Sequence, residues 1–425
     1  MSILRSRAGL WRVLLVGAVI GLLTPVRVYY DSIGYITSGM SFFSGSFEQD
    51  YQWLREPLYP LFLRVLLEAP LGLPVHLIPV FQGVALAGGF WLFAATAKGM
   101  GLLRREEPAT YYAFTCLLIT GYSGAVLQQP LTVLAAGALA FCAMRLATAP
   151  VDRRILVATG VTGALAALLS GIFLPAVVLL PFAASVVARK RLTWSPFVAA
   201  WGATALAMGT WMLIRVVNGQ PFGLGGAARL ERADTSDWAR RIHAFLATFG
   251  LSPDFYDGVN FNVLSYSNVA LGLNPYFGSD TCTHTDLVNL RTLPDTYAVC
   301  GSGLAPTLPA SLLQPLTAFV LLQVVVGAIA LVWAWSATSN LRLYAFVLVL
   351  TMIPCLPMAI VVADGNSRYG LPVLALSLVL TVGMASRAYE RVRHGLRAEA
   401  PDKAPDKAPD EASDEAPLRQ TQPAD

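Results

Sequence analysis

Long apolar segments recur along this chain, and they leave it one class of fold. Ten stretches are apolar enough and long enough to cross a hydrocarbon core of about 30 Å as helices. They span residues 9–26, 75–97, 109–127, 130–148, 155–171, 172–188, 195–217, 312–337, 341–362 and 369–386. The mean hydropathy is +0.57 and only 13% of the residues are charged, which excludes a soluble domain of 425 residues. The sequence therefore predicts an all-α polytopic membrane protein with about ten transmembrane helices.

The basic residues predict how these spans are oriented. Nine of them fall in alternate short connections, at Lys98, Arg104, Arg105, Arg145, Arg153, Arg154, Arg189, Lys190 and Arg191. The positive-inside rule makes those connections cytoplasmic, together with both termini, and it makes the long connections 27–74 and 218–311 extracytoplasmic. Arg145 and Arg215 lie near span ends and are expected to extend toward the polar surface. The short connections and the tail indicate the plasma (inner) membrane of a bacterium.

The net charge of +4 follows from this topology. The basic residues are scattered over several connections and form no stripe, so no nucleic-acid partner is expected. The partner that the composition does predict is the membrane itself.

Residues 1–390 are predicted to form one transmembrane domain, and residues 391–425 a disordered cytoplasmic tail. The tail repeats Ala-Pro-Asp-Lys and has too little apolar surface to form a core. Short helices are predicted at 31–44 and 57–68 in the first outer connection and at 236–249 in the second. The helix at 57–68 is expected to lie in the membrane interface through an apolar stripe made of Leu58, Leu61, Phe62, Val65 and Leu66.

Asp31 and Tyr35 follow the first span and share one face of the predicted helix, at i and i+4 spacing. Ionisable groups kept at the edge of a membrane span are functional candidates by default. An isolated carboxylate there can act as a general base that accepts a proton from an attacking hydroxyl. The alternative is structural, because an aspartate at this position also caps the start of a helix.

The candidate anion-binding residues are Arg55, in the first outer connection, and Arg368, between the last two spans. A guanidinium group binds phosphate through two parallel hydrogen bonds. The alternative for each is an ordinary ion pair, of Arg55 with Glu56 and of Arg368 with Asp364.

Two further pairs lie in the outer connections. Glu48 and Asp50 are candidates to bind a divalent cation together with Asp31, because hard cations prefer several oxygen ligands; the alternative is that they are solvated loop charges. Cys282 and Cys300 share the second outer connection on the oxidising side, which predicts a disulfide, with free thiols as the alternative. No other cofactor is predicted, since the chain has no phosphate-binding Gly-Lys-Ser/Thr loop.

Three motifs in this order resemble those of the GT-C superfamily of polyprenol-linked membrane glycosyltransferases, in the branch that includes protein O-mannosyltransferases and bacterial aminoarabinose transferases. The first is Asp31 with Tyr35 after the first span. The second is an Arg-x-Pro-x-Tyr-Pro-Leu-Phe motif at 55–62. The third is an Arg-Tyr-x-x-Pro motif at 368–372, which opens a late span. The resemblance covers roughly residues 10–390.

The resemblance implies an inverting glycosyltransferase that moves a sugar from a polyprenyl-phosphate carrier to a lipid, glycan or protein acceptor at the extracytoplasmic face. It implies that Asp31 is the catalytic base. Substrate binding would fall to Arg55 and Arg368 at the donor phosphate and to Tyr35, Tyr59 and Tyr369 in the sugar and carrier pocket, with Glu56 beside them.

Two other classes of function stay open. A lipid-linked glycan transporter or polymerase-like protein would carry polar and charged residues deep within several spans. A non-catalytic membrane partner of a glycan-assembly complex would not depend on Asp31 or Arg55.

Overall fold

The computed structural model is helical throughout the part of the chain that it describes, which agrees with the predicted all-α class. It describes residues 2–23, 30–42, 55–67, 77–118, 124, 126–187, 193–220, 222, 238–248, 310–337, 341–357 and 367–398. Within these ranges the regular elements are α-, 3-10 and π-helices, with no β-strand.

The α-helices follow the apolar segments of the sequence. In the first half of the chain they are α1 (Ser2–Leu23), α2 (Tyr30–Ser41), α4 (Leu58–Leu67), α5 (Leu77–Gly99), α6 (Glu107–Leu118), α7 (Gln129–Thr148) and α8 (Arg153–Leu169). In the second half they are α9 (Leu174–Leu179), α10 (Ser195–Phe197), α11 (Ala203–Val217), α13 (Trp238–Thr248), α16 (Ala310–Ala337), α17 (Leu341–Met352) and α18 (Leu371–Ala398). The predicted helices at 31–44, 57–68 and 236–249 correspond to α2, α4 and α13.

Short 3-10 and π segments continue several of these helices. They are η1 (Gly171–Phe173), η2 (Leu180–Phe182), η3 (Ala183–Val187), η4 (Val198–Gly202), η5 (Ile353–Cys355) and η7 (Ser367–Gly370).

Four helical segments among the described residues are long and apolar enough to cross a membrane, namely Leu77–Gly99, Gln129–Thr148, Ser195–Val217 and Leu371–Arg393. Four shorter apolar segments accompany them, at Ala8–Leu22, Gly171–Val187, Val325–Ala337 and Leu341–Cys355. These lengths and compositions support a multi-pass membrane protein. The full number of about ten spans stays a prediction, although a helix overlaps every predicted span.

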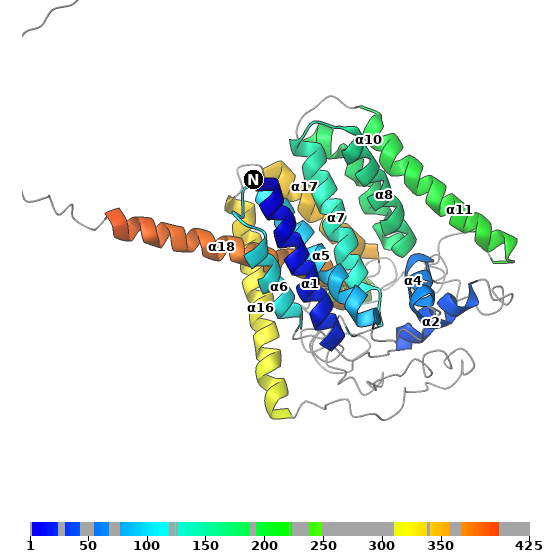
Figure 1. Cartoon of the computed structure of the whole chain (residues 1–425), viewed down its shortest axis with the longest axis horizontal. Coiled ribbons are helices and arrows are strands. Elements are labelled where there is room, and N and C mark those ends of the chain that lie inside the picture. The colour runs from blue at the N-terminus through cyan, green and yellow to red at the C-terminus, as the bar shows by residue number, and fades with distance from the viewer. Residues whose placement is uncertain are drawn as a thin grey trace, which may run out of the picture. The chain divides into compact units, whose positions relative to one another are not determined.

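Helix α5 lies at the centre of the bundle, between α1 and α7 (Figure 1). Glycines allow these close contacts. A Cβ atom built on Gly17 of α1 would lie 2.6 Å from the Gly83 carbonyl oxygen of α5, and one built on Gly137 of α7 would lie 2.7 Å from the Gly89 carbonyl oxygen. Small residues at helix crossings are the usual means of close packing in membranes, where lipid and side chains are equally apolar.

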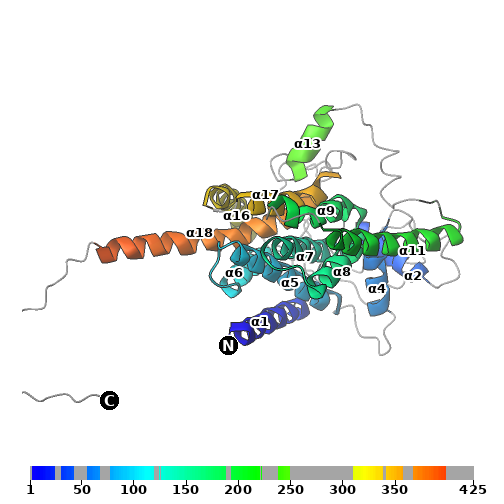
Figure 2. The same cartoon turned by 90° about the horizontal axis from the view of Figure 1, so that it is seen from above.

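The remaining helices extend this packing on the far side of α7. Helix α8 packs against α7 and α11, and α17 packs against α7 (Figure 2). The start of α8 is set locally by Asp152, whose side chain accepts a hydrogen bond of 2.8 Å from the Ile155 backbone N–H. Pro130 lies in the first turn of α7, where its missing N–H has no effect on the helix.

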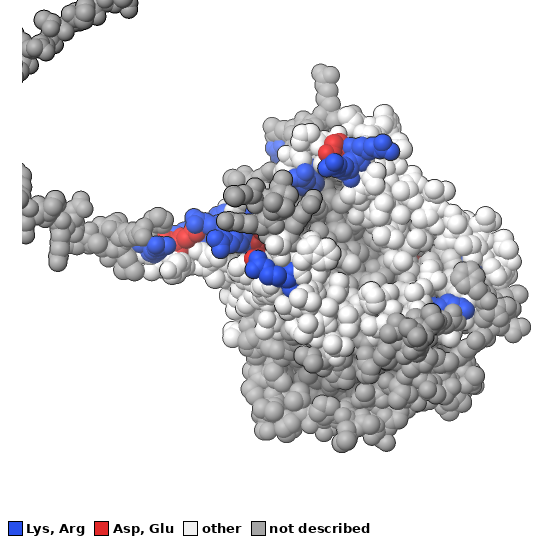
Figure 3. All heavy atoms as spheres, in the orientation of Figure 1, with Lys and Arg blue, Asp and Glu red and all other residues white. Residues whose placement is uncertain are grey.

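Many of the described charges of the bundle gather at one end, which we call the basic end and define by Lys98, Arg104, Arg105, Arg145, Arg153 and Arg154. Lys98 near the end of α5 pairs with Glu106 at 2.7 Å, and Arg12 of α1 pairs with Glu107 at 2.9 Å. On the face shown in Figure 3, most of the described surface carries neither positive nor negative side chains. This separation of apolar flank from charged end is what a bilayer requires.

The chain divides into two units, Met1–Ala385 and Ser386–Asp425. Helix α18 extends to Ala398, and residues 399–425 of the predicted tail lie outside the described residues. The predicted disorder of the tail therefore stays a prediction.

Candidate functional site

Helices α2 and α4 carry Asp31, Tyr35 and Tyr59 of the predicted site, and Arg55 and Glu56 come just before α4. The two helices pack directly against each other. Gly39 of α2 permits this, because a Cβ atom there would overlap the Pro60 carbonyl oxygen. Beside this contact, Arg64 of α4 donates a hydrogen bond of 3.2 Å to the Met40 carbonyl oxygen. The tight α2–α4 pair brings residues 30–42 beside residues 55–67.

Helix α4 buries a face that the sequence pattern did not single out. Tyr59 and Leu63 are fully buried and Leu66 nearly so, whereas Leu61 and Val65 of the predicted stripe are 36% and 63% exposed. The helix thus has one apolar face against the protein and another on the surface. Burial is decided by contact with α2 and α5, and the apolar pattern of α4 did not identify the buried face.

The structure brings together three of the predicted site residues, Tyr35, Arg55 and Tyr59, which we call the arginine–tyrosine cluster. The Arg55 guanidinium lies over the Tyr35 ring at 4.2 Å from its centroid. The Tyr35 and Tyr59 rings meet edge to face at 4.9 Å and 89°. Tyr35 and Tyr59 are buried and Arg55 is half-buried. The stacking orients the guanidinium plane through a cation–π contact.

Tyr59 is anchored at its far end by α5. Its hydroxyl donates a hydrogen bond of 2.7 Å to Gln82 Oε1, and both side chains are fully buried. Burial, and to a smaller extent the nearby Tyr35, raises the pKa of Tyr59 well above its usual value, so this hydroxyl stays protonated and acts as a donor. Our sequence prediction missed Gln82, although a lone amide within the apolar segment 75–97 was the signal that could have found it.

The cluster continues through further aromatic contacts. Phe62 stacks on Tyr59 at 5.8 Å between centroids and meets Phe81 of α5 at 6.0 Å. The aromatic path therefore leads from Arg55 to the start of a membrane-crossing helix. This arrangement places the Arg55 cation close to apolar surface, without a wide polar region between the two.

Unlike its neighbour Arg55, Glu56 lies beside Gly171. A Cβ atom built on Gly171 would lie 3.0 Å from Glu56 Oε1, so the carboxylate lies where a side chain of residue 171 would be. Gly171 begins the helical segment 171–187, whose free N–H groups favour a nearby carboxylate. Glu56 thus contributes to packing, and its role in substrate binding stays a prediction.

The third motif lies in η7 and opens α18. This segment contacts η5 and α13, and η5 in turn contacts η1, where Glu56 lies. Tyr369 is half-buried there, and the side chain of Arg368 lies outside the described residues. The backbone thus connects the late motif to the surroundings of Glu56, but the described contacts do not join Tyr369 to the arginine–tyrosine cluster.

Asp31 lies in the first turn of α2, which begins at Tyr30, one residue before the start of the predicted helix 31–44. Its backbone is four positions before Tyr35, as the predicted spacing requires. The side chain of Asp31 lies outside the described residues. An acidic residue in a first turn also stabilises the helix dipole, so both the catalytic and the structural roles stay predictions.

Arg215 corrects one prediction. It is only 1% exposed, so it does not extend to the polar surface as its place near a span end suggested. It lies one turn after Trp211, which packs on Phe42 beyond the end of α2 with ring centroids 5.7 Å apart. A buried arginine close to α2 is therefore a further candidate for the site. The signal was its isolation in an apolar segment.

The predicted cation ligands Glu48 and Asp50 and the predicted disulfide Cys282–Cys300 lie outside the described residues. Within the part of the chain that the structure describes, no group of three or more His, Cys, Asp or Glu side chains is placed to hold a metal ion. Metal binding and the disulfide both stay predictions.

Comparison with known proteins adds no assignment: no protein family, no curated protein and no solved structure matches this chain. The function has to be argued from the arginine–tyrosine cluster and its place in the membrane.

Proposed function

We propose that this chain is an inverting glycosyltransferase that moves a sugar from a polyprenyl-phosphate carrier to an acceptor at the extracytoplasmic face of the plasma membrane. The observation that carries the proposal is the Arg55 guanidinium held over Tyr35 beside the apolar α4. A lipid-linked phosphate needs a cation and apolar surface next to each other, and Arg55 beside α4 provides both at the end of α5 opposite Lys98.

Arg55 would bind the phosphate of the donor. As the sugar leaves the carrier, negative charge grows on the phosphate oxygens, and a cation already oriented there stabilises the transition state more than the ground state. The Tyr35 ring keeps the guanidinium plane in place, so little reorganisation is needed. The half-exposed Leu61 and exposed Val65 on α4 would contact the isoprenoid chain.

Asp31 would act as the general base. It accepts the proton of the acceptor hydroxyl while that oxygen bonds to the anomeric carbon, and the bond from that carbon to the phosphate oxygen breaks. The electron pair of the broken bond stays on the carrier phosphate, and attack from the opposite face inverts the anomeric centre. Arg368 and Tyr369 would complete the donor site. A divalent cation at Asp31, Glu48 and Asp50 remains an optional part of this proposal.

The sidedness rests on charge. Lysines and arginines gather at the basic end, which the positive-inside rule assigns to the cytoplasm. Tyr59 contacts Gln82 near the opposite end of α5, so the arginine–tyrosine cluster would face the cell exterior.

The test is sugar transfer in vesicles that contain the protein and a radiolabelled polyprenyl-phosphate sugar. Wild type should consume the donor and label an acceptor, whereas Asp31→Asn should lower turnover by roughly 10²–10⁴-fold, the usual contribution of a general base. Arg105→Gln at the basic end is the control and should retain full activity. Repeating the assay with a chelator tests the cation.

Two outcomes would redirect the proposal. Equal turnover by wild type and Asp31→Asn would remove the base assignment. If wild type consumes no donor across several sugars, a transporter or a non-catalytic partner of a glycan-assembly complex becomes the better interpretation.

A further inference from the structure

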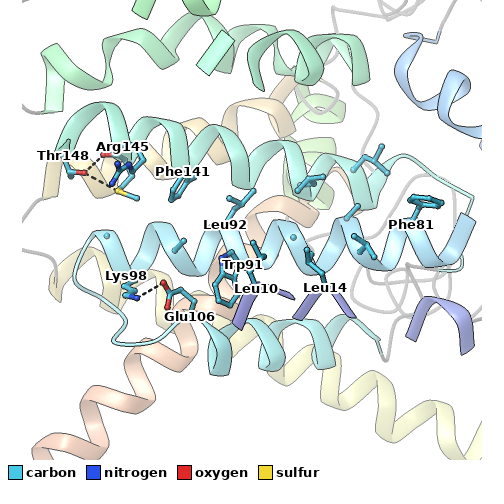
Figure 4. Close-up of a pocket in the computed structure, with 18 of the residues that line it drawn as sticks. Leu10, Leu14, Phe81, Trp91, Leu92, Lys98, Glu106, Phe141, Arg145 and Thr148 are labelled. Carbon is cyan, nitrogen blue, oxygen red and sulfur yellow. Dashed lines mark hydrogen bonds and ion pairs between the residues drawn. The ribbon is translucent and has the colours of Figure 1, made fainter. Parts of the chain in front are cut away.

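An apolar groove runs along α5 between α1 and α7, and Phe62 and Phe81 line it at the end that adjoins the arginine–tyrosine cluster. Its volume is about 960 Å³. Leu10 and Leu14 of α1 line one side, and Leu134 and Phe141 of α7 line the other. Figure 4 shows the groove extending from Phe81 at one end of α5 to Lys98 at the other. It is as large as the bigger ligand sites of proteins, which measure roughly 300–1,000 Å³.

The groove is apolar along its length and charged at one end. Lys98, Glu106, Arg145 and Thr148 line that end, which belongs to the basic end of the bundle (Figure 4). Lys98 is paired with Glu106 at 2.7 Å, whereas no acidic side chain among the described residues forms an ion pair with Arg145. Two cations and one carboxylate leave this end with one net positive charge.

The dimensions suit a lipid chain. From Phe81 to Lys98 the helix rises about 26 Å, close to the thickness of about 30 Å of a hydrocarbon core. The floor at Gly88 is narrow: a Cβ atom there would lie 3.3 Å from Leu134 and 3.8 Å from Leu14. Since a packed helix is about 10–12 Å wide, it would not fit between these walls, but acyl chains would.

We propose that this groove binds an anionic glycerophospholipid of the cytoplasmic leaflet. The phosphodiester lies at Arg145 and beside Thr148, and the acyl chains run along Leu92 and over Gly88. A guanidinium and an oxyanion form the strongest class of hydrogen bond, and basic pockets between membrane helices on the cytoplasmic side favour anionic headgroups. The headgroup would lie between α1 and α7 at the end opposite the proposed transferase site, and lipid binding does not depend on that activity.

The proposal is tested by lipid binding to the full-length protein in detergent, with bound lipid counted by native mass spectrometry. Phosphatidylglycerol and phosphatidylcholine with identical acyl chains are the two probes. Wild type should prefer phosphatidylglycerol on the order of tenfold, the factor expected from one charge-assisted hydrogen bond. Arg145→Gln should abolish that preference, and Arg145→Lys should keep most of it. Arg153→Gln is the matched control, since Arg153 is exposed at the same end but does not line the groove.

The acyl part is tested by filling the groove. Gly88→Leu and, independently, Leu92→Trp should reduce phosphatidylglycerol binding, whereas Gly209→Leu should not, because nothing lies within 4 Å of a Cβ atom at Gly209. Each variant is compared only if it elutes as a single peak of wild-type size. The proposal is overturned if the two lipids bind equally well, if Arg145→Gln retains the preference, or if both groove-filling variants bind like wild type.

Discussion

Arg55 and Arg145 lie at opposite ends of the same helical bundle, and their surroundings differ. Arg55 is half-buried and stacked on Tyr35, which belongs to a buried aromatic pair. Arg145 is exposed at the mouth of an apolar groove, without an acidic partner among the described residues. The protein itself orients the first arginine, whereas only a ligand would orient the second. A preoriented cation suits transition-state stabilisation, and an exposed one suits reversible binding of a lipid headgroup.

This comparison predicts that the end with the arginine–tyrosine cluster is sensitive to small changes. Gly39→Ala should produce the largest effect, because its new Cβ atom would overlap the Pro60 carbonyl oxygen, which cannot rotate away. We expect a loss of about 3 kcal/mol of unfolding free energy together with loss of sugar transfer. Gly209→Ala is the matched control and should change stability little. Denaturant unfolding in detergent would measure the stability of both variants. A Gly39→Ala variant as stable as wild type would contradict the tight α2–α4 contact.

The two arginines can be compared directly. Arg55→Gln should lower sugar transfer on the order of 30-fold, equivalent to about 2 kcal/mol of lost charge-assisted hydrogen bonding. Arg145→Gln should leave transfer within about twofold, because it removes no group near the reacting atoms. The same vesicle assay measures both variants. Equal losses in the two would show that the ends are not functionally separate.

A smaller effect is expected where the cluster meets α5. Tyr59→Phe removes the donor that pairs with buried Gln82, and this should destabilise the protein by about 1.5 kcal/mol. The additional substitution Gln82→Met removes the other polar group and should recover part of the lost stability. Replacing both hydrogen-bond partners by apolar groups is tolerated better than replacing only one, which leaves a buried polar group unsatisfied. Thermal unfolding of the two single variants and the double variant forms the required cycle.

The smallest effect concerns pH. The folded-state pKa of Tyr59 is raised, so folding favours its protonated form. This contribution to stability is fully present below the pKa of a tyrosine in the unfolded chain, which is near 10. It is lost as the pH rises from there toward the folded-state pKa of Tyr59, by about 1.4 kcal/mol of unfolding free energy per pH unit. Unfolding free energies between pH 9 and 11 should therefore fall more steeply for wild type than for Tyr59→Phe. Tyr111→Phe is the control, and a slope that Tyr59→Phe leaves unchanged would contradict the prediction.

The local structure of the candidate site was accessible from the sequence. The helix predicted at 57–68 is α4, and the one predicted at 31–44 is α2, which ends earlier, at Ser41. Tyr35, Arg55 and Tyr59 were predicted to act together, and the structure does bring them together. Other site predictions, including Asp31 as the base, are not tested by the described residues.

Three features of the molecule could not be predicted in the same way. Gln82 and Arg215 are buried polar residues within apolar segments. A hydropathy value averaged over a segment does not reveal single residues of this kind. The buried face of α4 was not identified, because apolar residues lie both on that face and on the exposed one. The groove along α5 was invisible, since it arises from three helices and belongs to none of them.

The sequence by itself determined that the chain forms apolar helices and which segments form them, because hydrophobicity acts along each segment. It did not determine all their ends, since α6 ends at Leu118 and the predicted span runs to 127. It also determined the spacing of the polar residues at the span ends. Only the tertiary structure decided that Arg55 stacks on Tyr35, that Tyr59 reaches Gln82, and that Arg145 opens onto an apolar groove. These three contacts depend on which glycines let two helix backbones approach each other. They therefore depend on packing between helices, which sequence periodicity does not encode.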